Sequence, residues 1–117
     1  MAITGAHMLL YSSEPELLRA TLRDVLGWTN VDSGDGWLIF ALPPSELGVH
    51  PSDPSQAGHH EVSLICDDID GTVLDLRTKG IAFRGDVVDR GFGLAITMLL
   101  PGGVEVLLYQ PRHRTAI

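Results

Sequence analysis

Residues 61–80, EVSLICDDIDGTVLDLRTKG, carry the clearest signals of secondary structure in the chain. The first six residues, 61–66, are mostly apolar, as is typical of a short strand. The Asp pair at 67–68 predicts a helix start, because carboxylates there satisfy free backbone N–H groups and complement the helix dipole. Apolar side chains then recur at helical spacing, and a Lys-Gly pair ends the helix. The stretch therefore predicts a strand that leads into a helix.

Three further strands are predicted after this helix. Residues 82–88, 94–100 and 104–109 are rich in β-branched and other apolar side chains, and polar or glycine-containing turns separate them. The second of these turns is Pro101-Gly102-Gly103, whose composition is typical of a tight turn. Residues 60–111 therefore predict a unit with the order strand, helix, strand, strand, strand, written βαβββ.

The residues before this unit predict the same order of elements. Residues 6–11 form a short apolar run, and the Ser-Ser-Glu-Pro sequence at 12–15 is a strong helix start. An amphipathic helix follows and ends at a glycine. Residues 29–32, 37–42 and 47–50 are then predicted as three short strands.

The two predicted units have matching positions. When Ser13 is aligned with Asp67, His7 falls opposite Glu61 at the same offset. This correspondence favours an internal duplication. The alternative interpretation is that two unrelated hairpin sheets share the same order of elements.

The expected organisation is one α+β domain over residues 1–117. Repeat one spans residues 3–50, a linker rich in Pro, Ser and Asp spans residues 51–58, and repeat two spans residues 60–111. The helix of each repeat covers only the outer face of its sheet, so the inner face must be covered by the other repeat. We therefore expect the two βαβββ repeats to form curved mixed sheets around a cavity.

Composition and charge exclude several classes of partner. Lys and Arg number 8 against 15 Asp and Glu, which gives a formal charge of −7, and no basic run is present to bind nucleic acid. No segment has the roughly 20 apolar residues that span a bilayer, and no leader is evident. The single cysteine, Cys66, has apolar neighbours and is interpreted as a small buried hydrophobe, so a cytoplasmic location is expected.

The pattern resembles the vicinal oxygen chelate superfamily, which includes glyoxalases, bleomycin resistance proteins and extradiol dioxygenases. The resemblance covers nearly the whole chain and rests on the element order, the Ser-Ser-Glu-Pro and Cys-Asp-Asp-Ile-Asp junctions, the Pro-Gly-Gly turn and the terminal Tyr-Gln-Pro. It implies a fold of the glyoxalase/bleomycin-resistance type and a homodimer. Because the superfamily contains both enzymes and metal-free antibiotic-binding proteins, it does not imply one reaction.

The resemblance also implies where a metal would bind. Enzymatic members hold a divalent ion of iron, manganese, zinc, nickel or magnesium with a His or Glu from the first and fourth strands of each unit. Two of these four positions carry suitable side chains, whereas Leu47 and Leu107 occupy the other two. Ordinary structural roles are the alternative for each candidate. His7 and Glu61 stand at the two matching positions, and His50 and Glu105 lie near the two leucines. The predicted ligands are therefore His7, Glu61, His50 and Glu105.

Two functions follow from this comparison. The first is a metal-dependent lyase or dioxygenase, in which the ion acts as a Lewis acid and Glu61 or Glu105 moves a proton. The second is a metal-free protein that binds an antibiotic or metabolite, and the leucines at 47 and 107 favour it. In both cases we expect a small-molecule ligand.

Overall fold

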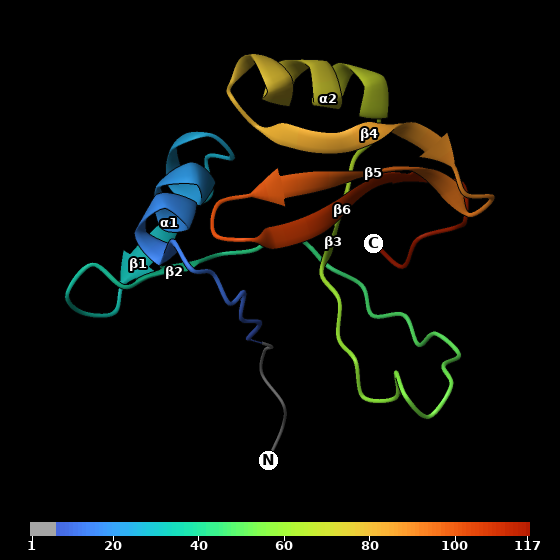
Figure 1. Ribbon diagram of the computed structural model, residues 1–117, viewed down its shortest axis with the longest axis horizontal. Coiled ribbons are helices and arrows are strands. Elements are labelled where there is room, and N and C mark those ends of the chain that lie inside the picture. Colours follow the sequence, from blue (N-terminus) through green and yellow to red (C-terminus); the bar gives the residue numbers. More distant parts are fainter. Residues whose placement is uncertain (1–6) are drawn as a thin grey trace.

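A four-stranded sheet and one helix form the second half of the chain. The computed structural model describes residues 7–117, and the sheet has the strand order β3-β6-β5-β4. β3 pairs with β6 in parallel, whereas the other neighbours are antiparallel (Figure 1). The predicted βαβββ unit is therefore confirmed for this half. Its elements are β3 (Ser63–Ile65), α2 (Ile69–Thr78), β4 (Ala82–Asp89), β5 (Gly93–Leu100) and β6 (Val104–Pro111).

Polar contacts fix the start of α2 against the sheet. The side chain of Asp68 accepts a hydrogen bond from the backbone N–H of Gly71, as predicted for the Asp pair. The Gln110 side chain accepts a second bond, from the N–H of Ile69 at 2.9 Å. Because Gln110 belongs to β6, this bond ties the helix start to the end of that strand. Neither helix in residues 7–117 is long and apolar enough to cross a membrane.

The first half contains one helix and one hairpin. α1 (Pro15–Asp24) is followed by β1 (Asn30–Asp32) and β2 (Leu38–Phe40), which pair only with each other. The Arg19 guanidinium lies 5.4 Å from the centre of the Trp37 ring and so connects the helix to the hairpin.

Two strands predicted for this half are wrong in the described residues. Residues 7–11 and 47–50 are irregular, and position 6 of the first predicted strand lies outside the described residues. The prediction relied on apolar content, which does not supply the neighbouring strand that backbone pairing requires. Leu47 and Val49 are instead 92% and 94% exposed. Two complete repeats that enclose a cavity therefore stay a prediction.

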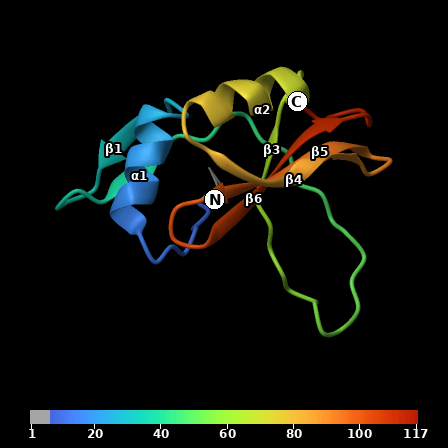
Figure 2. The ribbon, with the colours of Figure 1, turned by 45° about the horizontal axis from the view of Figure 1, so that its top comes forward.

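One hydrophobic core joins the two halves. Leu18 and Leu22 of α1 are buried in the same cluster as α2 and the helix-facing side of the sheet. Figures 1 and 2 show α1 beside the turn between β5 and β6, whereas α2 lies across the sheet. The other buried members of this cluster are Ile69, Val73, Leu76, Ile81, Ile96, Met98, Leu100, Val104, Val106 and Leu108.

Hydrogen bonds from the start of α1 hold it to that turn. The backbone N–H of Ser13 donates to the carbonyl oxygen of Gly102 at 3.1 Å, and the Ser12 hydroxyl donates to that of Pro101 at 2.8 Å. The Ser-Ser sequence predicted as a helix start therefore also positions α1 on the sheet.

Candidate functional site

The face of the four-stranded sheet that lies opposite α2 is the candidate site. Side chains alternate along a strand, so a residue between two core residues points away from the core. On β6 the even-numbered residues from 104 to 108 are buried, and therefore Glu105, Leu107 and Tyr109 lie on the opposite side. We call this side of the sheet the open face.

Cross-strand pairing arranges the open face in rows. Residues that pair directly across neighbouring strands have their side chains close together on the same face. The centre of the open face therefore mixes apolar side chains with three hydroxyl groups, those of Ser63, Thr97 and Tyr109. Its two central rows are Ser63, Leu107 and Thr97, and Ile65, Tyr109 and Ala95.

An ion pair crosses one end of the open face. The guanidinium of Arg84 on β4 donates a hydrogen bond to the carboxylate of Glu105 on β6, across the intervening β5. Both side chains are about half exposed, so solvent screens the pair and its contribution to stability is about 0–1 kcal/mol. The ion pair places one positive and one negative group at the edge of the open face.

An aromatic cluster occupies the other end. The ring centres of Phe92 and Tyr109 lie 5.7 Å apart in an edge-to-face arrangement, and those of Tyr109 and His113 lie 6.2 Å apart. Burial raises the pKa of the Tyr109 phenol, and the negative charge of Glu46 raises it further. Because Tyr109 takes part in both ring contacts, it is the central member of this cluster.

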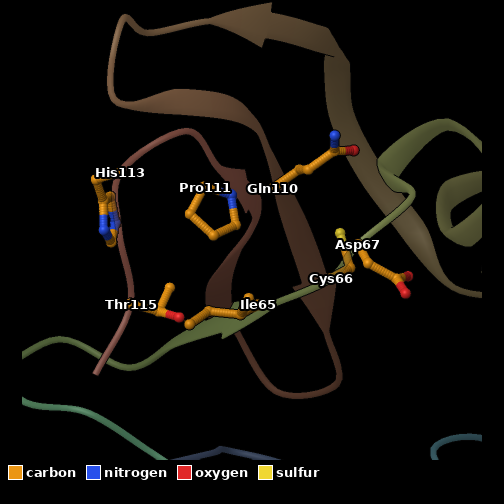
Figure 3. A pocket seen from close by; sticks show the side chains of 7 residues that line it. All are labelled: Ile65, Cys66, Asp67, Gln110, Pro111, His113 and Thr115. Atoms are coloured by element: carbon orange, nitrogen blue, oxygen red, sulfur yellow. The ribbon is translucent and has the colours of Figure 1, made fainter. Parts of the chain in front are cut away.

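An open pocket of about 640 Å³ adjoins the aromatic cluster. Figure 3 shows Pro111 between the end of β3 and the C-terminal segment, which carries His113 and Thr115. Segments far apart in the sequence thus form opposite walls of the pocket. Its lining residues are Ile65, Cys66, Asp67, Gln110, Pro111, His113 and Thr115.

Two solved structures have the same architecture. TnmS3, an antibiotic binding protein from Streptomyces sp. CB03234, is 22% identical, with a TM-score of 0.67 over 95% of this chain and 98% of that chain. A member of the glyoxalase/bleomycin resistance protein/dioxygenase superfamily from Sphaerobacter thermophilus DSM 20745 is 20% identical, with a TM-score of 0.60 over 92% of this chain and 98% of that chain. The chain has the fold of this superfamily. No protein-family model and no curated protein matches the sequence.

Three of the four ligands that the superfamily resemblance predicts lie in irregular, exposed segments. They are His7, His50 and Glu61. The Nδ1 atom of His50 lies 2.6 Å from the carbonyl oxygen of Pro51, and the Glu61 carboxylate lies 3.3 Å from Nε2 of His59. Glu105 is the only one of the four on the sheet. Within residues 7–117, no group of three or more His, Cys, Asp or Glu side chains is placed to hold a metal ion.

The open face at Leu107 does not fit the metal centre that the superfamily resemblance implies. Leu107 lies at the middle of β6, between Ser63 and Thr97, and an aliphatic side chain has no atom that can ligate a metal. The nearest carboxylate on the strand belongs to Glu105, which already binds Arg84. An apolar group therefore occupies the position where the resemblance predicts a metal ligand.

Cys66 lies on the helix-facing side, and chemistry at its sulfur is not expected. It is half-buried and packs against the core, close to its predicted environment. Its Sγ atom lies 3.6 Å from the carbonyl oxygen of Tyr109. Burial raises the pKa of the Cys66 thiol, which lowers the fraction of reactive thiolate.

Sequence reasoning found only part of this site. It named Glu105 as a candidate site residue, and it missed Arg84 and Thr115. Arg84 could have been found from its charge amid the apolar residues of a predicted strand. Thr115 carries no signal, because its place in the pocket depends on how the C-terminal segment folds back.

Proposed function

We propose that this chain binds a small molecule, such as an antibiotic or a metabolite, without a metal ion. The match to TnmS3 over nearly the whole of both chains carries the proposal, because that protein is an antibiotic binding protein. Leu107 supports the metal-free form of the proposal, since it places an alkyl group where a metal ligand is expected.

The chemistry of the open face suits such a ligand. Binding sites for small molecules are mostly apolar, with a few polar groups that fix orientation. Here Leu107, Tyr109 and Phe92 offer apolar contact, whereas the ion pair of Arg84 and Glu105 offers hydrogen bonds at one edge. The formal charge of −7 favours a cationic ligand over an anionic one.

Protein purified without chelators is expected to bind a ligand from a panel of antibiotics and metabolites while it holds no stoichiometric metal. Tyr109→Ala should weaken that binding by about tenfold to a hundredfold, because it removes the ring at the centre of the aromatic cluster. Equilibrium dialysis measures the affinity, and elemental analysis of the same sample measures the metal.

Leu74→Ala is the matched control for the site variant. Leu74 is 67% exposed on α2, away from the open face, so its removal should leave ligand affinity unchanged. A stoichiometric metal that is lost in His7→Ala would overturn the proposal. It would favour instead the metal-dependent enzyme, with Glu61 or Glu105 as the group that moves a proton.

We also propose that the chain works as a homodimer, in the cytoplasm. Two segments of the first half leave apolar side chains in solvent that a second copy can cover. Leu9 and Tyr11 are 55% and 87% exposed, and Leu47 and Val49 are exposed almost completely. Each of the two segments thus exposes two apolar side chains that are two residues apart, and exposed apolar patches are typical of interfaces between proteins.

Sizing chromatography with light scattering is expected to give the mass of two chains. The double variant Leu47→Asp, Val49→Asp should shift the protein to one chain, because two carboxylates would have to lose water at the interface. Leu74→Asp places one such carboxylate at another exposed leucine and should leave the mass unchanged. A wild-type protein with the mass of one chain would contradict the proposal.

A further inference from the structure

The C-terminal segment is fixed to the sheet at its first residue. The backbone N–H of Arg112 donates to the carbonyl oxygen of Phe92 at 2.8 Å, and its guanidinium donates to the carboxylate of Asp89 at 2.6 Å. This guanidinium is also the main reason that the pKa of Asp89 lies below its usual value. Arg112 therefore holds the chain at the β4–β5 turn.

The residues after Arg112 are held at one further point. The backbone N–H of Ala116 donates to the Glu46 carboxylate at 2.6 Å. The bond itself is solvent-exposed, with Ala116 exposed and Glu46 partly buried. Among the described residues, no backbone–backbone hydrogen bond holds residues 113–117. This segment is thus anchored at one end and fastened by a single solvent-accessible bond near the other.

Between these two points, the segment lies over the aromatic end of the open face. The His113 ring is 6.2 Å from that of Tyr109, and Thr115 lies across the pocket from Cys66 and Asp67 (Figure 3). Glu46, which fastens the segment, is also close enough to Tyr109 to affect its ionisation. The segment and Glu46 thus approach the same aromatic ring.

We propose that residues 113–117 form a strap, hinged at Arg112 and closed by the contact between Ala116 and Glu46, that controls access to Tyr109. A single exposed hydrogen bond is easily broken, so the strap opens without unfolding the sheet beneath it. That the strap admits and then covers a ligand rests on the proposed small-molecule function. Its closure over Tyr109 does not depend on that function.

Acetylation of tyrosine by N-acetylimidazole tests the strap without any ligand. Deletion of residues 113–117 should raise the rate at Tyr109 by about threefold to tenfold, as expected when a contact that is closed most of the time is removed. Glu46→Ala should give a similar rise. Mass spectrometry of the two tyrosine-containing peptides measures both rates, and Tyr11, which is 87% exposed, is the reference within the same molecule.

Glu46→Gln separates the fastening bond from the charge. Its amide oxygen still accepts a bond from Ala116, so the rate at Tyr109 should rise much less than in Glu46→Ala. Glu16→Ala, an exposed glutamate on α1, should change neither tyrosine. Unchanged rates in the deletion variant, or equal rises in Glu46→Gln and Glu46→Ala, would overturn the strap. None of these outcomes depends on whether a ligand or a metal binds the open face.

Discussion

Met98→Ala is expected to lower the free energy of unfolding by about 2–5 kcal/mol. Met98 is 0% exposed at the middle of β5, a strand that lies between β4 and β6. It pairs directly with Phe83 and Val106, and neighbours on both sides limit how far the core can collapse into the space that the shorter side chain leaves. A domain of this size is stable by about 5–15 kcal/mol, so the loss is a large fraction of the total. Urea denaturation followed by tryptophan fluorescence measures it.

The exposed control for this variant is Leu74→Ala. Leu74 belongs to α2 but points into solvent, so its truncation should change the free energy of unfolding by less than about 0.5 kcal/mol. A similar loss in both variants would contradict the placement of Met98 in the core that α1 and α2 share with the sheet.

The second half of the fold could be predicted because its signals are local. A helix start at the Asp pair, apolar residues at helical spacing and a closing glycine place α2 within a residue or two of its observed bounds. Turns rich in glycine delimit β5 and β6 in the same way. Local sequence signals thus indicate where α2, β5 and β6 begin and end, and which side of each element is buried.

The first half could not be predicted as well, because its strands depend on partners. Residues 7–11 and 47–50 have the apolar character of strands, yet pairing needs a neighbour that no local pattern specifies. The same limit applies to the site. Alternation along β6 indicates that Tyr109 faces away from the core, whereas the return of residues 113–117 over its ring depends on a contact with distant Glu46.

Gly102→Ala is expected to lower the free energy of unfolding by about 2–4 kcal/mol, through two separate costs. Gly102 has a φ of 81°, which a side chain at Cβ disfavours. A Cβ atom there would also lie 2.6 Å from the backbone nitrogen of Glu14 and 2.7 Å from that of Ser13, and closer still to the Ser12 hydroxyl. Backbone atoms at the start of α1 cannot move without breaking the bond between Ser13 and Gly102.

Gly103→Ala separates these costs, because it carries the same conformational strain without the contact. Its φ is 79°, and nothing lies within 4 Å of the position that a Cβ would occupy. We expect it to lose only about 1–2 kcal/mol, and thermal or urea denaturation of the two variants gives the difference. The difference between the two losses of unfolding free energy measures how much the contact between the β5–β6 turn and the start of α1 stabilises the protein. Only the Cβ atom of the Gly102 variant meets the backbone at the start of α1. Equal losses would mean that the start of α1 does not rest tightly on this turn, and that apolar contacts such as those of Leu18 and Leu22 hold the helix to the sheet.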